Sequence, residues 1–125
     1  MLRAYKFRIY PTRSQKTKFE NTFSMCRHLY NWSLAERNEV WEKKRSVTYT
    51  EQQNRLPAMK KQRPWFASVH SQVLQDVLRR LDKAYKNFYK RVNDPKIKEK
   101  GFPKFKKNWI ICINQQIIYW QTLIL

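Results

Sequence analysis

The side chains that could carry out catalysis or hold a metal ion are few in this sequence and widely separated. The two histidines, His28 and His70, lie far apart, and Cys26 and Cys112 form no CxxC pair. Structural zinc sites place cysteine and histidine ligands at short, regular spacings, which these residues do not share. The acidic residues are scattered, and no HExxH, P-loop or GxSxG motif occurs. The sequence therefore predicts no catalytic residue, no metal site and no cofactor.

Basic residues offer a different chemistry, the binding of phosphates. The chain has 27 Lys and Arg against 9 Asp and Glu, a formal net charge of +18. Such a charge favours a polyanionic partner, most often nucleic acid. Basic and aromatic residues are interleaved in three stretches, 5–8, 85–90 and 102–106. This pattern is typical of phosphate contacts combined with base stacking, although the aromatics could instead be core residues. Both interpretations stay open for Phe102 and Phe105.

The element that must position most of these charges is a helix predicted over residues 69–92. Its apolar residues recur every three or four positions, which is the spacing of one helix face. We expect its aromatic residues to be core and its charges to contact phosphate. Ser71 is a candidate N-cap, and Pro95 cannot continue the helix. The basic residues that we expect to contact phosphates here are Arg79, Lys83, Lys86 and Lys90.

The pattern predicts further helical structure over residues 14–44. Phe19, Phe23, Cys26 and Tyr30 follow one another at helical spacing. Either Thr12 or Ser14 can cap the N-terminus. One bent helix and two separate helices fit the pattern equally well.

The N-terminal residues 2–10, LRAYKFRIY, predict a β-strand instead, because they alternate, are rich in aromatics and end at Pro11. A single strand needs partners, which we expect from the C-terminal part of the chain. A short helix is predicted over about residues 50–62, capped by Thr48 or Thr50. The predicted fold class is therefore mainly α with a small β element (α+β).

Four blocks of sequence occur in the order RAYKFRIYPTRSQ, CRHLYNWSLAER, QVLQDVLRRLDKAYKNFYKR and GFPKFKK, within residues 1–107. In this order they resemble the TnpB family, the RNA-guided nucleases of insertion sequences that are also described as OrfB-type transposases. The resemblance implies a β-barrel wedge domain with a helical recognition domain, described in the family as helix-turn-helix, inserted into it. It divides the chain into a wedge strand at 1–10, a recognition domain at 11–95, a basic return segment to the barrel at 96–108 and an atypical tail at 109–125.

In that family the wedge and recognition parts hold the guide RNA and read a short motif that flanks the target DNA. Matching the blocks implies that Tyr49, Ser71 and Gln75 contact this motif. Because family members can have a lysine at the position of Ser71, the base preference of this chain is open. Gln75 also has a chemical argument, since glutamine can form two hydrogen bonds with adenine; its alternative role is an ordinary helix-surface residue. Lys104 and Lys106 are expected to add phosphate contacts.

The tail from Trp109 to Leu125 carries no charged residue. It is shorter than the run of about 20 apolar residues that spans a membrane, and Asn and Gln interrupt it. The family continues here with more barrel strands, a RuvC-type nuclease domain with three metal-binding acids and a zinc-binding insert, none of which the tail matches. We therefore expect a frameshift or a premature end in the gene. The alternative is a final strand at Ile110–Ile113 that pairs with residues 3–9.

Together these observations predict a nucleic-acid-binding portion of a TnpB-like protein with no nuclease activity of its own. Its expected partners are DNA and structured guide RNA, without a membrane, and its expected location is the cytoplasm because no signal peptide follows Met1. The alternatives are a stand-alone DNA- or RNA-binding regulator and one part of a split nuclease. The DNA downstream of the gene distinguishes them, since a RuvC-like coding stretch in another frame favours a decayed or split enzyme. The oligomeric state is left open.

Overall fold

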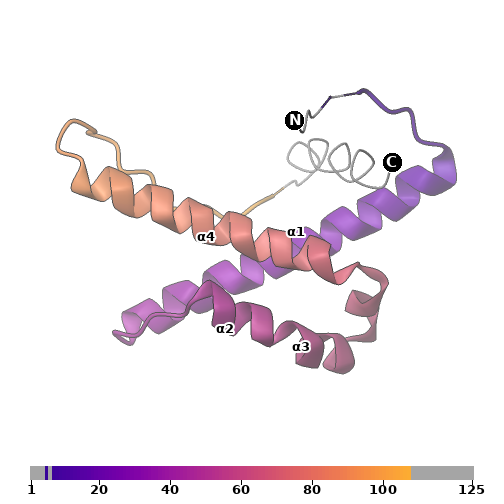
Figure 1. Ribbon diagram of the computed structural model, residues 1–125, viewed down its shortest axis with the longest axis horizontal. Coiled ribbons are helices and arrows are strands. Elements are labelled where there is room, and N and C mark those ends of the chain that lie inside the picture. Colours follow the sequence, from indigo (N-terminus) through magenta and orange to yellow (C-terminus); the bar gives the residue numbers. More distant parts are fainter. Residues whose placement is uncertain (1–4, 6, 108–125) are drawn as a thin grey trace.

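A computed structural model of the chain describes residues 5 and 7–107, and helices dominate this part (Figure 1). The elements are α1 (Arg13–Glu42), α2 (Tyr49–Asn54), α3 (Leu56–Gln62), the short 3-10 helix η1 (Pro64–Ser68) and α4 (Ser71–Asn93). The two long helices, α1 and α4, cross and pack against each other, while α2 packs on α4 and α3 packs on η1. The prediction of a mainly helical chain is confirmed.

The N-termini of α1 and α2 are held by the same kind of cap. Thr12 Oγ1 accepts a hydrogen bond from the Gln15 backbone N–H, and the Gln15 side chain accepts one from the Thr12 N–H. Thr48 and Glu51 form the equivalent reciprocal pair at α2. Each pair satisfies backbone donors that a helix start leaves without a partner. Of the predicted alternatives, Thr12 and not Ser14 caps α1, and Thr48 and not Thr50 caps α2.

The predicted cap of α4 is wrong by one residue. His70 is the N-cap, and its Nδ1 accepts a hydrogen bond from the Gln72 N–H at 3.3 Å. Ser71 is instead the first helical residue, and its hydroxyl contacts α3. Serine is a favoured N-cap residue, but here the Ser71 hydroxyl accepts a hydrogen bond from Lys60 of α3.

The question of one or two N-terminal helices is settled by α1, which is continuous over 30 residues. It ends where Lys44 adopts a left-handed backbone conformation with a φ of 55°. The N–H groups of Lys44 and Arg45 donate to the carbonyl oxygens of Trp41 and Val40, at 2.9 and 3.0 Å. These bonds close the end of the helix and turn the chain toward α2.

The core lies where α1 and α4 cross, closed by α3 and η1. Its buried residues are Phe23, Cys26, Leu29, Tyr30, Leu34, Leu56, Phe66, Val69, Leu74, Val77, Leu78, Leu81 and Tyr85. The predicted apolar face of the 69–92 helix is therefore confirmed up to Tyr85. The expectation that all of its aromatic residues are core is wrong for Tyr89, which is 45% exposed. The buried residues of α4 end at Tyr85, and the helix continues for two further turns beyond them.

The predicted N-terminal strand is not present among the residues that the structure describes. Tyr5 and residues 7–10 adopt no regular structure and are exposed. A strand is stable only when a neighbouring strand accepts and donates its backbone hydrogen bonds, and the described chain offers none. The other positions of the 2–10 segment, and Ile110–Ile113, lie outside the described residues. The small β element of the predicted fold class is therefore not shown.

After α4 the chain returns to α1. The Lys106 backbone N–H donates to Asn31 Oδ1 at 2.8 Å, and Asn31 Nδ2 donates to the Lys106 carbonyl oxygen at 3.0 Å. One turn earlier on α1, Arg27 donates to the Lys107 carbonyl oxygen at 2.6 Å. These bonds hold the end of the basic segment against the middle of α1.

Candidate nucleic-acid interface

Most of the predicted contact residues lie in one row along α4. The residues of this row, called the α4 stripe from here on, are Ser71, Gln75, Arg79, Lys83, Lys86 and Lys90. They follow one another at steps of three or four, so at about 100° per residue they fall within an arc of roughly 120°. The buried residues of α4, among them Leu74 and Leu81, lie on another face. The core therefore turns the α4 stripe outward, over a length of roughly 28 Å at about 1.5 Å per residue.

The structure brings Tyr49 into contact with this stripe. Arg79 Nε donates a hydrogen bond to Tyr49 Oη at 3.1 Å. Tyr49 is the first residue of α2, so the cap at Thr48 fixes its position. Two residues that the sequence predicted separately, 30 positions apart, thus form one contact.

A buried glutamine that the sequence analysis did not single out holds α2 in place. Gln52 Nε2 donates to the Ser33 carbonyl oxygen at 3.2 Å and to Glu36 Oε2 at 3.0 Å. Its Oε1 accepts from Arg37 Nε at 3.0 Å. Because Gln52 is only 3% exposed, these bonds replace those that water would have made. They tie α2 to α1 and so position Tyr49 above α4.

Lys60 is the second residue that the sequence did not reveal. It comes from α3, and its ammonium donates to Ser71 Oγ at 2.8 Å and to the Val69 carbonyl oxygen at 3.0 Å. Ser71 thus has a cation beside it at the start of the α4 stripe. Only the tertiary packing of α3 produces this contact, and no local pattern indicates it.

The charges of the stripe differ in how they are paired. Lys86 lies 2.9 Å from Asp82, which also binds Arg37 at 3.3 Å. The Lys86 side chain is 73% exposed, so its ion pair contributes little and can be exchanged for a phosphate. Lys83 and Arg79 line a shallow hollow of about 520 Å³ on the surface of α4. Both residues are exposed.

The lysines of the C-terminal segment are placed differently. Lys104 is exposed. Lys106 is half-buried, and its ammonium lies 5.8 Å from the centre of the Tyr30 ring. The structure therefore holds Lys106 against α1 and does not bring it into the α4 stripe.

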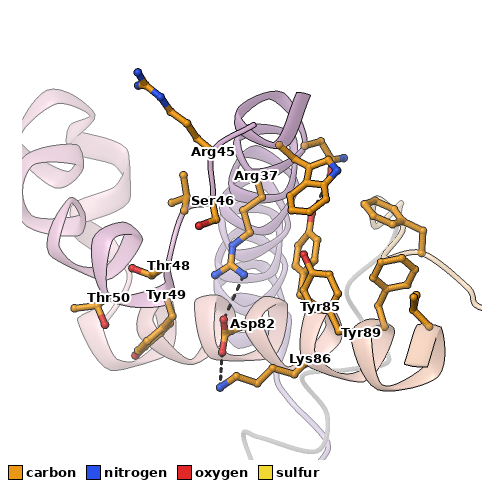
Figure 2. A pocket seen from close by; sticks show the side chains of 16 residues that line it. Arg37, Arg45, Ser46, Thr48, Tyr49, Thr50, Asp82, Tyr85, Lys86 and Tyr89 are labelled. Atoms are coloured by element: carbon orange, nitrogen blue, oxygen red, sulfur yellow. Dashed lines mark hydrogen bonds and ion pairs between the residues drawn. The ribbon is translucent and has the colours of Figure 1, made fainter. Parts of the chain in front are cut away.

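A groove adjoins the stripe between the end of α1, the connection to α2 and the second half of α4 (Figure 2). Its volume is about 860 Å³, and we call it the aromatic groove. Figure 2 shows Tyr85 and Tyr89 on one side and Tyr49 on the other, with the Arg37–Asp82–Lys86 ion pairs between them. Tyr85 Oη donates to Asn38 Oδ1 at 2.8 Å, and burial raises the pKa of Tyr85 to about 12.

Comparison with known proteins now shows which family the chain resembles. Residues 1–46 match a family model of the OrfB type from IS605 elements, described as a helix-turn-helix domain. A candidate RNA-guided DNA endonuclease of Streptomyces pristinaespiralis is 35% identical over 102 residues, covering 78% of this chain and 25% of that protein. InsQ of Escherichia coli K12, named as a candidate enzyme of the same kind, is 32% identical over 109 residues, covering 85% of this chain and 25% of its own length. The chain is similar to the OrfB (TnpB) family.

The OrfB-type chain matches the N-terminal portion of that family and spans about a quarter of the length of these curated relatives. The resemblance seen in the sequence is thus confirmed. The helix-turn-helix match ends within the connection between α1 and α2. Because the two relatives match over more than a hundred residues, their similarity extends beyond it.

The residues that could have served as ligands or nucleophiles have structural contacts in the OrfB-type chain. Cys26 is buried, and this burial raises the pKa of its thiol to about 12. The His28 ring packs edge-on against Trp65, with the ring centres 5.4 Å apart. Within residues 5 and 7–107 no three His, Cys, Asp or Glu side chains gather where they could hold a metal ion. Over the same residues no helix is both long and apolar enough to cross a membrane.

Proposed function

We propose that this OrfB-type chain is a nucleic-acid-binding module that sets α4 against the phosphates of DNA and structured RNA. The observation that carries the proposal is the α4 stripe, in which the basic residues share one exposed face while the core occupies another. A helix fits the major groove of duplex DNA, where exposed Lys and Arg side chains reach the flanking phosphates. The formal net charge of +18 adds attraction over a longer range.

Within this module, Tyr49, Ser71 and Gln75 read the motif that flanks the target DNA. Their proximity supports this proposal, because Arg79 joins Tyr49 to the stripe and Lys60 adds a cation beside Ser71. Gln75 lies between them on the same face of α4. A guide RNA as second partner is supported by the names of the two relatives, which describe both as candidate RNA-guided DNA endonucleases.

The proposed module binds without cutting and contributes no nuclease activity of its own. The support is that residues 1–46 match a helix-turn-helix model and that the matched part of the chain covers only 25% of each of the two relatives. A role beside a separately made catalytic part fits the same observation. In either case the described residues supply recognition.

The test is the salt dependence of binding to a DNA duplex. If about six phosphates are neutralised, the slope of log K against log salt is roughly −5, since each contact contributes about −0.9. Replacing Arg79, Lys83 and Lys86 with Ala should flatten this slope by as much as about 3 and weaken binding to all sequences alike. Fluorescence anisotropy over a salt series measures both quantities.

A matched control removes the same charge elsewhere. Arg13, Lys16 and Lys18 are exposed in the first turns of α1, and their replacement with Ala should change the slope less. Equal effects of the two triple variants would show that only total charge matters. Binding that does not depend on salt would remove the nucleic-acid proposal altogether.

A further inference from the structure

The aromatic groove exposes flat rings beside the basic face of α4. Trp41, at the end of α1, is 65% exposed, and Tyr89 and Phe102 are 45% and 47% exposed. All three line the groove. Several exposed rings that line one groove form contiguous apolar surface, which marks interaction sites more often than a single exposed ring does. The groove is therefore a candidate site for a flat, apolar ligand group.

On the α4 side of the groove, contacts between aromatic rings fix the surface around Tyr89. Phe102 packs edge-on against Tyr85 and against Phe88, with ring centres 5.8 and 5.1 Å apart. Tyr85 is fixed in turn by its hydrogen bond to Asn38. A ligand ring that enters the groove would thus meet preformed surfaces, which lowers the entropy lost on binding.

The charges around the groove favour an anion. Its lining contains the acid Asp82 and the cations Arg37, Arg45 and Lys86. Arg37 is largely buried against Asp82 and acts as a structural partner. Lys86 is exposed, and Figure 2 shows Arg45 extending outward at the edge of the groove. A ligand with a flat base and a phosphate would satisfy the rings and these two cations together.

We propose that the aromatic groove binds an unpaired nucleotide of single-stranded nucleic acid. Its base stacks on Trp41 and Tyr89, and its phosphates lie near Lys86 and Arg45. An apolar peptide would cover the rings but would offer no anion to Lys86 and Arg45. The volume of about 860 Å³ lies within the range of about 300–1,000 Å³ that is usual for small-molecule sites. The inference rests on the nucleic-acid binding proposed above and adds single strands to the duplex as ligand.

The test compares three probes at a salt concentration of about 0.5 M, which weakens contacts to phosphate alone. They are an unstructured octathymidylate, an abasic strand of the same length and a DNA duplex. Trp41→Ala and Tyr89→Ala should each weaken octathymidylate binding by about 5- to 150-fold, the range found for the loss of one base–aromatic stack. The affinities of both variants for the abasic strand and for the duplex should stay within about 2-fold of the wild-type values, since stacking needs an unpaired base.

Trp41→Phe provides a variant that keeps a ring and should retain most of the affinity. Phe105→Ala is the matched control, because Phe105 is 56% exposed and does not line the groove. Circular dichroism of each variant checks that α1 and α4 are intact. Because Trp41 and Tyr89 are surface residues, we expect no loss of helix.

Two results would overturn the inference. One is that Trp41→Ala and Tyr89→Ala change octathymidylate affinity no more than Phe105→Ala does. The other is that they weaken the abasic strand as much as octathymidylate, which would indicate charge or folding effects. If the duplex still responds to the loss of Arg79, Lys83 and Lys86, only this inference fails and the proposed function stands. If no probe binds even at low salt, where contacts to phosphate are strong, both fail.

Discussion

Single residues of the interface act through partners that lie far away in the sequence. Arg79 carries a charge for phosphate, yet its guanidinium is oriented by the Tyr49 hydroxyl. Such a hydrogen bond restricts the rotation of a long side chain, so less entropy is lost when a phosphate binds. Tyr49 therefore holds Arg79 in place, a role that does not depend on the DNA contact proposed for Tyr49 itself.

Replacing Gln75 should change the preference among DNA sequences without changing the electrostatic attraction to phosphates. In Gln75→Ala the slope of the salt dependence should stay unchanged, because no charge is lost. The preference among flanking motifs should shift by about 1–3 kcal/mol, the value of one bidentate base contact. Selection of bound duplexes from a randomised library measures this preference. Asn87→Ala, an amide on α4 outside the stripe, is the control, and an unaltered preference in Gln75→Ala would contradict the proposed contact.

The Cys26 thiol should make the free energy of unfolding depend on pH in the alkaline range. Burial, and next the Asp76 carboxylate, raise its pKa from 9.0 to about 12 in the folded protein. Below about pH 9 the thiol is protonated in both states and stability is unaffected; above it the unfolded chain releases the proton first. The free energy of unfolding should therefore fall as pH rises from about 9 to about 12.

Urea unfolding at about pH 8 and about pH 10 measures this effect, with Cys26→Ala as the control that lacks the thiol. The wild-type chain should lose more stability between the two values than the variant does. Tyr85 has a pKa raised to about 12 and contributes in the same direction in both proteins, so it cancels in the comparison. An equal loss of unfolding free energy in both proteins would show that burial does not raise the pKa of the Cys26 thiol.

At the scale of elements, the turn after α1 decides where α2 begins and hence where Tyr49 lies. Lys44 occupies a left-handed conformation that costs an L-residue with a Cβ about 1–2 kcal/mol. Glycine adopts the same conformation without this cost and is the usual residue at such helix ends. The chain thus keeps a positive charge here at the expense of stability.

Lys44→Gly should raise the free energy of unfolding by about 0.5–1 kcal/mol, less than the full strain because glycine also gives the unfolded chain more freedom. Lys43→Gly removes the same charge at the neighbouring residue, whose φ of −82° carries no such strain. This control should be neutral or destabilising. Thermal and urea unfolding compare the two, and a less stable Lys44→Gly would rule out strain at this position.

Local elements were predictable from the sequence, and contacts between elements were not. The caps at Thr12 and Thr48 depend on residues within three positions, so the sequence alone indicates them. The contact between Lys60 and Ser71 depends on how α3 packs, which no periodicity encodes. The N-terminal strand is not shown in the described part, because alternation indicates a strand without supplying its partner. The stripe could be predicted because helical spacing alone brings its residues together.

For the whole molecule, the described residues form the surfaces that we propose bind nucleic acid, and no three of their His, Cys, Asp or Glu side chains gather where they could hold a metal ion. We therefore expect the purified chain with Mg²⁺ and any guide RNA to leave DNA intact. Gel electrophoresis of labelled duplex measures this, with the full-length E. coli relative InsQ as the comparison. Metal-dependent cleavage that accompanies the chain through gel filtration would contradict the expectation.

The contact of Lys60 with Ser71 has an evolutionary consequence. The ammonium at the start of α4 comes from Lys60 of α3, so a lysine at position 71 would place a second ammonium beside it. Two ammonium groups at hydrogen-bond distance would repel each other, and like charges this close are destabilising. The two positions should therefore covary, so that homologues have a lysine at one of them and an uncharged or acidic residue at the other. The positive charge at the start of α4 can thus come from a lysine on α3 or from one on α4, with the same net charge on the surface.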